Sequence, residues 1–163
     1  GHASADYVCT GVWSEKAIEE ARKYAGVNVV ATDVANNFRS VPAFNTWQLD
    51  PNAAYLHYTP NETIHGVEFD FIPQVDVPLV ADYSSSILSE PLDVFKFGLI
   101  YAGAQKNIGP AGLVVVIVRE DLLGKARKAV EGMRAAHAAR ALGISRATLI
   151  KKIRVYDLAE KPR

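Results

Sequence analysis

The stretch that most constrains the fold is the longest uninterrupted aliphatic run in this 163-residue chain, Leu113-Val114-Val115-Val116-Ile117-Val118. Six residues are too few to cross a bilayer, which takes about 20. A short run that is apolar on both faces is typical of a strand covered on both sides, as in a mostly parallel sheet. The run therefore predicts an α/β fold, and we expect no membrane partner.

Shorter apolar runs recur along the chain and are separated by turn-forming residues. They predict strands at residues 6–10, 27–31, 53–57, 78–81, 98–102 and 112–118, and alternation predicts a half-exposed segment at 67–71. Apolar residues at helical spacing predict one helix over 15–24, with Ser14 as its cap and Gly26 as its stop. Residues 33–52 carry Asn, Pro and Asp signals that predict mostly loop.

Size and composition indicate one globular domain, or one domain with a small appendage. The mass is 17.8 kDa, with 49% hydrophobic and 22% charged residues, which excludes wholesale disorder. The single cysteine, Cys9, has no partner for an internal disulfide, and we see no signal peptide. A reducing compartment, the cytoplasm, is therefore expected. Because the chain starts at Gly1, we also expect that it was cut from something longer.

The zero net charge conceals two segments of opposite sign. Residues 1–124 hold 7 Lys and Arg against 15 Asp and Glu, a net charge of −8, while residues 125–163 hold 11 against 3, a net charge of +8. Such a division suggests two different physical roles. We therefore predict an acidic α/β body over 1–124 and a basic helical tail over 125–163.

Three polar positions follow predicted strands, where open α/β sheets place their ligands: Thr63, Asp82 and Gln105-Lys106. A partly desolvated lysine there is a usable nucleophile toward carbonyls. A nearby carboxylate such as Asp82 could keep a pyridinium nitrogen protonated, and an aromatic such as Trp13 could lie on the ring. Taken singly, each residue also fits a plainer role: a solvated lysine, a turn-forming aspartate or a core tryptophan.

Four runs together resemble the phosphoserine aminotransferase family over about residues 5–125. They are Asp6-Tyr7-Val8 with Gly11-Val12-Trp13-Ser14, His57 to Gly66, Ala81 to Ser85, and Tyr101 to Gly112. The last run, YAGAQKNIGPAG, is long and specific. The resemblance implies the large domain of a fold-type I aminotransferase, which is a homodimer.

The resemblance also implies a cofactor and its contacts. Lys106 matches the lysine that forms a Schiff base with pyridoxal 5'-phosphate, and Asp82 matches the partner of the pyridine nitrogen. Trp13 matches the aromatic stacked on the ring, Thr63 a cofactor-binding hydroxyl, and Gln105 a contact to the cofactor phosphate. The implied reaction transfers an amino group between glutamate and 3-phosphohydroxypyruvate in serine biosynthesis. No metal site is predicted.

The resemblance stops short of the whole family sequence. A phosphate loop and a carboxylate-binding arginine precede the matching part in the family, and an Asn-Thr pair and a small domain follow it; this sequence shows none of them. We therefore expect the isolated chain to bind pyridoxal phosphate weakly, to turn over little or not at all, and to self-associate through uncovered apolar surface.

The basic tail resembles a Fis-type helix-turn-helix over about residues 133–158. An Ala-rich helix is predicted to end at Gly143, and Ser145 can cap a second helix. The resemblance implies possible DNA contacts by six residues: Arg146, Ala147, Thr148, Lys151, Lys152 and Arg154. Asp157 stands where that family usually has glycine.

Three functions remain open at this stage. The first is an aminotransferase segment with an incidental tail, and the second is a DNA-binding protein whose body is a scaffold or a pyridoxal phosphate sensor. The third is a chimeric sequence with neither activity. A plain basic helical hairpin is the simpler interpretation of the tail.

Overall fold

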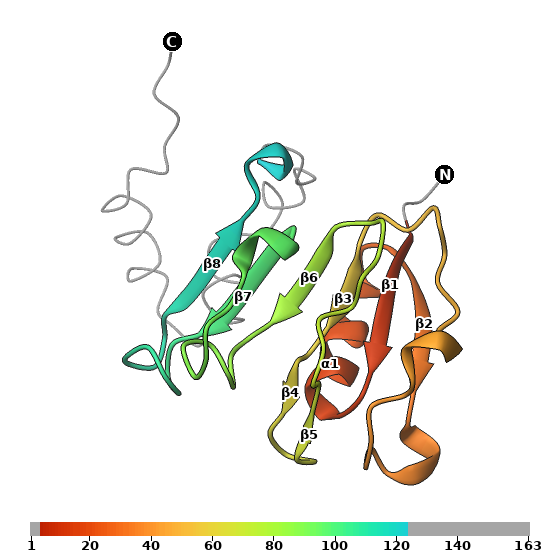
Figure 1. Cartoon of the computed structure of the whole chain (residues 1–163), viewed down its shortest axis with the longest axis horizontal. Coiled ribbons are helices and arrows are strands. Elements are labelled where there is room, and N and C mark those ends of the chain that lie inside the picture. Colours follow the sequence, from red (N-terminus) through yellow and green to blue (C-terminus); the bar gives the residue numbers. More distant parts are fainter. Residues whose placement is uncertain (1–3, 124–163) are drawn as a thin grey trace.

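The computed structural model describes residues 4–123, and these form a twisted main sheet, a small second sheet and one α-helix (Figure 1). The six-stranded sheet has the order β2-β1-β3-β6-β7-β8, and a separate two-stranded hairpin pairs β4 with β5. The predicted tail over 125–163, including the helix-turn-helix and its six proposed DNA contacts, lies outside the described residues.

Five of the six strands are parallel, as the sequence predicts for an α/β fold. The exception is β8, which runs antiparallel to β7. The parallel arrowheads in Figure 1 point the same way, so the carboxyl ends of these strands meet along one rim. The bounds are β1 Ser4–Cys9, β2 Gly26–Thr32, β3 Leu56–Tyr58, β6 Leu79–Asp82, β7 Leu99–Gly103 and β8 Val114–Val118.

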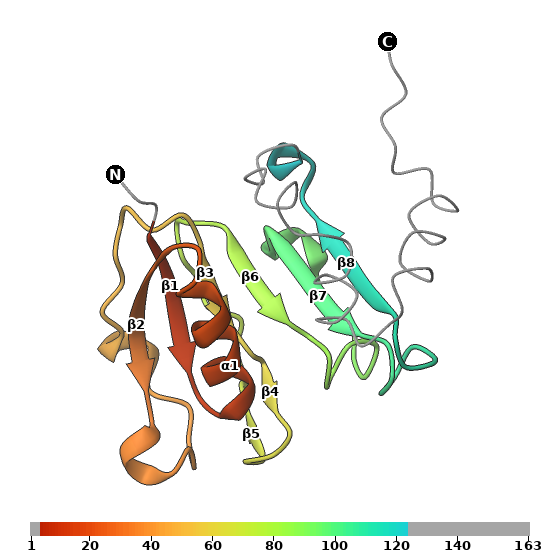
Figure 2. The ribbon, with the colours of Figure 1, turned by 180° about the vertical axis from the view of Figure 1, so that it is seen from behind.

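The single described α-helix, α1 (Val12–Ala21), lies against the face of the sheet that Figure 2 shows in front. Ile18 of α1 is buried together with Tyr7 and Cys9 of β1. It lies on the face of the helix that the spacing of apolar residues in the sequence predicts to be buried. The predicted start is wrong, because the helix begins at Val12 with Gly11 as its N-cap. Ser14 lies inside the first turn, where its Oγ accepts the N–H of Gly11 at 3.0 Å.

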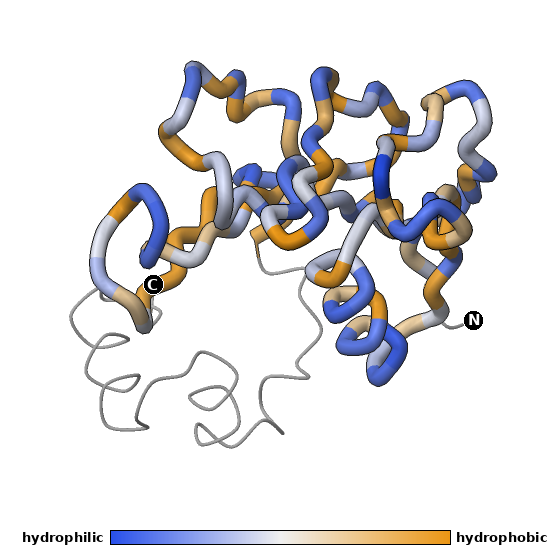
Figure 3. Tube along the Cα trace, turned by 90° about the horizontal axis from the view of Figure 1, so that it is seen from below, coloured by the Kyte–Doolittle hydropathy of each residue, from blue (hydrophilic) through white to orange (hydrophobic). Residues whose placement is uncertain are grey.

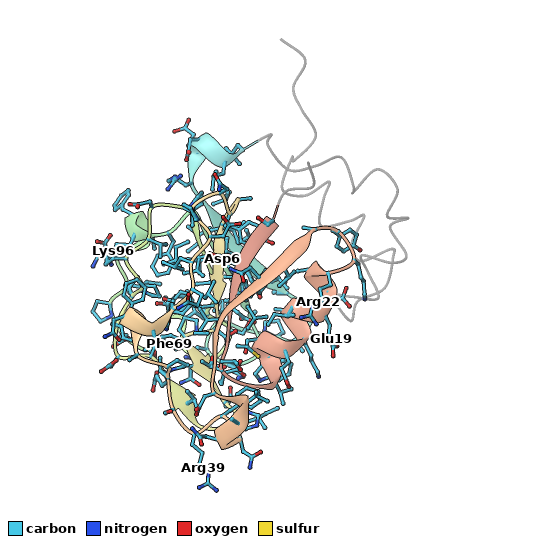
Figure 4. The ribbon with its side chains drawn as sticks, turned by 90° about the vertical axis from the view of Figure 1, so that its right-hand side faces the viewer. Asp6, Glu19, Arg22, Arg39, Phe69 and Lys96 are labelled. Atoms are coloured by element: carbon cyan, nitrogen blue, oxygen red, sulfur yellow. The ribbon has the colours of Figure 1, made fainter. Side chains whose placement is uncertain are left out.

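The main core lies on the opposite face of the sheet and joins residues of the five parallel strands, without β8. Leu56, Tyr58 and Ile100 are almost fully buried there. Burying an aliphatic side chain such as Leu56 or Ile100 contributes about 1.5–3 kcal/mol to folding. Phe69, labelled in Figure 4, packs on this core, whereas Glu19 and Arg22 lie on the exposed side of α1. In Figure 3, hydrophobic (orange) and hydrophilic (blue) segments alternate along the trace.

Short irregular elements connect the strands. The predicted loop 33–52 contains two 3-10 turns, η1 (Val34–Asn36) and η2 (Phe44–Thr46). The hairpin β4 (Asn61–Glu62) and β5 (Val67–Glu68) was not predicted as a pair, although the expected alternation holds. Val67 is buried and Glu68 is exposed. Two further 3-10 turns, η3 (Val94–Lys96) and η4 (Glu120–Leu122), follow β6 and β8.

The aliphatic run that predicts a doubly covered strand forms β8 but is not covered within the described part. All five residues of β8 are exposed, and Val116 reaches 56%. Among residues 4–123, β8 pairs only with β7 and stands at the edge of the sheet that these residues form. No helix between residues 4 and 123 has the length and apolarity that a membrane span requires.

Candidate functional site

The amine of Lys106 is held by two hydroxyl groups at the rim where the parallel strands end. Its Nζ donates to Thr63 Oγ1 and to Ser85 Oγ, each at 2.6 Å, and these two oxygens lie 2.6 Å from one another. Thr63 follows β4, Ser85 follows β6 and Lys106 follows β7. Three segments that are distant in sequence thus converge on one amine.

Lys106 remains exposed and carries no counter-charge in the described part of the chain. Between residues 4 and 123 the ion pairs join Lys23 to Glu20 and Arg119 to Asp121, so no carboxylate neutralises the Lys106 amine. Partial desolvation of this lysine is expected from the sequence, but the structure leaves its side chain accessible to solvent. An accessible amine between two hydroxyls is positioned to meet a small carbonyl compound or an anion.

Asp82 ends β6 one strand away and is tied to the end of β7 through Ser84. Its Oδ1 accepts the Ser84 hydroxyl at 2.6 Å and the Ser84 N–H at 3.0 Å. The same Ser84 Oγ accepts the N–H of Gly103 at 2.9 Å. This bridge holds the Asp82 carboxylate at the same rim as Lys106.

A buried aromatic group extends beneath Asp82. The register pairs Asp82 with Tyr101, and Nε2 of His57 lies 2.9 Å from the Tyr101 hydroxyl. His57 also stacks on Tyr7 at 4.8 Å between ring centroids. Burial lowers the pKa of His57 to about 4. Burial, and next the nearby Asp82 carboxylate, raise the pKa of Tyr101, so both rings are neutral at pH 7.

Trp13 lies in the first turn of α1 and is 39% exposed. Its backbone N–H donates to Oε2 of Glu62 at 3.0 Å, and the N–H of Ser14 donates to Oε1 at 2.8 Å. The ammonium of Lys16 lies 4.9 Å from the centre of the indole, a cation–π contact. Glu62 itself is fully buried and directly precedes Thr63.

Gln105 is exposed next to Lys106, and its side chain folds back over Gly103. A Cβ at Gly103 would lie only 2.5 Å from the Gln105 Oε1 atom. The small residue at the end of β7 therefore allows Gln105 to adopt this position.

The structure joins the predicted site residues in different ways. Thr63 contacts Lys106 directly, Asp82 is linked to the same rim through Ser84, and Gln105 adjoins Lys106 in sequence. Trp13 is linked to Thr63 only through Glu62, and within residues 4–123 no hydrogen bond or ring contact joins Trp13 to Asp82 or Lys106. No cluster of metal-ligating side chains occurs in that range.

Sequence reasoning assigned no role to Glu62, Ser84, Ser85, His57 or Tyr101. Ser84 and Ser85 follow the Asp82 strand end directly, so their position could have indicated them. His57 and Glu62 give no such signal, because their partners lie more than 40 residues away.

Comparison with known proteins gives a consistent result. The profile of a family described as aminotransferase class-V matches residues 2–147, beyond the boundary at 124 that the charge pattern predicts. A phosphoserine aminotransferase of Ectopseudomonas mendocina is 63% identical over 130 residues, which are 79% of this chain and 36% of that protein. The chain thus spans little more than a third of this relative's length.

Solved structures show the same similarity. Phosphoserine aminotransferase from Bacillus circulans subsp. alkalophilus superposes with a TM-score of 0.77 at 42% identity, covering 98% of this chain and 41% of that one. Phosphoserine aminotransferase from Trichomonas vaginalis, solved with pyridoxal phosphate bound, gives a TM-score of 0.69 at 46% identity, covering 75% and 35%.

Proposed function

We propose that this chain, which belongs to the class-V aminotransferase family, carries the pyridoxal phosphate site of a phosphoserine aminotransferase. The reaction transfers an amino group between glutamate and 3-phosphohydroxypyruvate. The observation that carries the proposal is the contact of Lys106 Nζ with Thr63 and Ser85 at the rim that also holds Asp82. The relatives named above support the choice of reaction.

The described residues fit this cofactor. An aldehyde needs an accessible amine, and Lys106 is exposed with no carboxylate paired to it among residues 4–123. A pyridine nitrogen needs an acid, and Asp82 is fixed by Ser84 at the end of the adjacent strand. The ring needs an apolar surface, and the indole of Trp13 offers a partly exposed face.

Each residue then has a distinct task. Lys106 Nζ would hold the cofactor through its aldehyde and would move a proton at the substrate α-carbon. Asp82 holds a proton on the ring nitrogen, Thr63 binds the cofactor through its hydroxyl, and Gln105 binds the phosphate. Trp13 holds the ring flat. Pyridoxal phosphate, when bound, supplies the electron sink that stabilises the substrate carbanion.

The remaining parts of the proposal concern the whole protein. We infer a homodimer in the cytoplasm, acting on amino acids and 2-oxo acids. We also keep the division into a body over 1–124 and a basic tail over 125–163 as part of the proposal.

DNA binding by the tail is a separate candidate function, based only on its sequence resemblance and basic charge. A mobility shift that weakens steeply with rising salt would support it. The absence of any shift at low salt would contradict it.

The direct test of the cofactor site is a titration of the 163-residue chain with pyridoxal 5'-phosphate, followed by visible absorption. We expect the yellow band of a lysine Schiff base in the unaltered chain and its loss in Lys106→Ala. Lys96→Ala, which removes another exposed lysine, is the matched control and should keep the band. An equal band in Lys106→Ala would reject the proposal.

A further inference from the structure

We infer that Glu62 is a positioning residue that fixes the distance between the indole of Trp13 and the amine of Lys106, and so sets the affinity for pyridoxal phosphate. The inference rests on the proposed function. It assigns to a buried carboxylate a role that neither the sequence motif nor the site chemistry requires.

Glu62 has no positively charged partner among residues 4–123. Its side chain is fully buried, and between residues 4 and 123 no lysine, arginine or histidine forms an ion pair with it. A buried carboxylate is costly unless strong hydrogen bonds compensate its lost hydration. Its compensation comes from the backbone N–H groups of Trp13 and Ser14, at 3.0 and 2.8 Å.

The two N–H groups that bind Glu62 stand where a helix favours a negative charge. They belong to the first turn of α1, where helices leave their N–H groups without partners and where negative charge is stabilised. Glu62 thus caps α1 from a segment 49 residues away. The bonds fix the backbone of Trp13, and thereby the position from which its indole extends.

Glu62 is followed directly by Thr63, which is part of the proposed site. The side chain of Glu62 binds the backbone of Trp13. The next residue, Thr63, contacts Lys106, because its Oγ1 lies 2.6 Å from Nζ. One dipeptide therefore joins the proposed ring-stacking residue to the proposed Schiff-base lysine. A shift of Glu62 would move the two relative to each other.

The backbone at Gly11 packs closely against the Glu62 carboxylate. A Cβ at Gly11 would lie 2.6 Å from both Cδ and Oε2 of Glu62. Gly11 is extended, with φ 169, so the restriction is steric and not conformational. Gly11→Ala therefore displaces the carboxylate without changing its chemistry, which gives a second way to test the same contact.

The experiment uses the 163-residue chain carrying Trp47→Phe. The sequence has two tryptophans, so this substitution leaves Trp13 as the only one that fluoresces. Three quantities are measured: the dissociation constant of pyridoxal 5'-phosphate from the absorption band, the quenching of Trp13 fluorescence on binding, and amide hydrogen exchange at residues 13 and 14 without cofactor. The variants are Glu62→Gln, Gly11→Ala and the control Asp6→Asn.

Glu62→Gln removes the charge and turns one acceptor oxygen into a donor that faces an N–H. We expect about tenfold faster exchange at residues 13 and 14 and about tenfold weaker cofactor binding, the size of a lost charge-assisted hydrogen bond. Trp13 quenching should fall, while excess cofactor still gives the full Lys106 band. Gly11→Ala should have the same three effects.

Asp6→Asn is the matched control, because Asp6 is also a fully buried carboxylate that accepts a backbone N–H, that of Asp50 at 2.9 Å (Figure 4). It should leave the dissociation constant within about twofold. Equal weakening by Asp6→Asn, or unchanged binding and quenching in Glu62→Gln and Gly11→Ala, would overturn the inference while leaving the proposed function intact. The absence of any band in the unaltered chain would overturn both.

Discussion

Nε2 of His57 lies 2.9 Å from the hydroxyl of Tyr101, and the bond passes over β6 from β3 to β7. The register pairs His57 with Val80 and Tyr101 with Asp82, two residues apart on β6, so all four side chains leave the same face of the sheet. The floor beneath the proposed pyridine-binding acid is thus a neutral, hydrogen-bonded pair of rings.

Acid should destabilise the chain through His57. Burial lowers its pKa to about 4 from the ordinary 6.5, so between these values the unfolded chain binds a proton that the folded chain does not. Stability then falls as pH decreases from 6.5 to 4, by up to about 3 kcal/mol, and is unaffected by this group above 6.5. Urea unfolding at a series of pH values measures the slope. His57→Gln should flatten it; an unchanged slope in His57→Gln contradicts the assignment.

Ser84→Ala should loosen the rim. The substitution removes the hydroxyl that donates to Asp82 at 2.6 Å and accepts from Gly103 at 2.9 Å. We expect a loss of about 1–3 kcal/mol in the free energy of unfolding, since the Gly103 N–H and the Asp82 oxygen lose a partner. Ser89→Ala, which removes one hydroxyl bound to the Ser86 carbonyl, is the control and should cost less. Equal losses in chemical denaturation would show that the bridge has no special weight.

Gly103→Ala should weaken cofactor binding without unfolding the chain. The added Cβ meets the far end of the Gln105 side chain at 2.5 Å, which can swing away at little cost. If Gln105 binds the cofactor phosphate from its present position, we expect severalfold weaker binding of pyridoxal phosphate at an unchanged melting temperature. Gln105→Ala should have a similar effect, and unaltered affinity in both variants would remove Gln105 from the site.

β8 should promote self-association. It is an edge strand whose aliphatic side chains are all exposed, a combination that favours pairing with another chain. Light scattering of the unaltered chain should show species heavier than a monomer, and Val116→Lys should reduce them. Val34→Lys is the control, because Val34 is similarly exposed at 54% but lies in the 3-10 turn η1. A monodisperse unaltered monomer would contradict this expectation.

The strands of the six-stranded sheet were predictable from sequence because they are short apolar runs between turn residues, as at Leu79–Asp82 and Leu99–Gly103. The two-residue strand β4 is not apolar and was not predicted, and β3 begins at Leu56 and not at the predicted residue 53. The start of α1 was not, because the carboxylate that caps it belongs to Glu62, 49 residues further on. Ser14 has the ordinary chemistry of a cap, but here it occupies the first turn and bonds back to Gly11, while the carboxylate of Glu62 accepts the N–H groups of Trp13 and Ser14. The direction of β8 was likewise undetermined, since an aliphatic run reads the same in both orientations.

In the candidate site, too, several of the residues were predictable from local sequence, whereas the contacts between them were not. Lys106, Thr63 and Asp82 were predicted as strand-end residues and by resemblance, and the structure brings the first two into contact. The oxygen of Ser85 completes that contact, and Glu62 links it to Trp13. These relations depend on which strand ends become neighbours, which local patterns do not encode.

The most direct test of the central claim is mass analysis of the chain after reduction with borohydride in the presence of pyridoxal 5'-phosphate. Reduction fixes the cofactor to whichever lysine holds it, and digestion then identifies that lysine. We predict one modified peptide, the one that contains Lys106. Modification spread over Lys16, Lys23 and Lys96 in proportion to their exposure, with no preference for Lys106, would contradict the account.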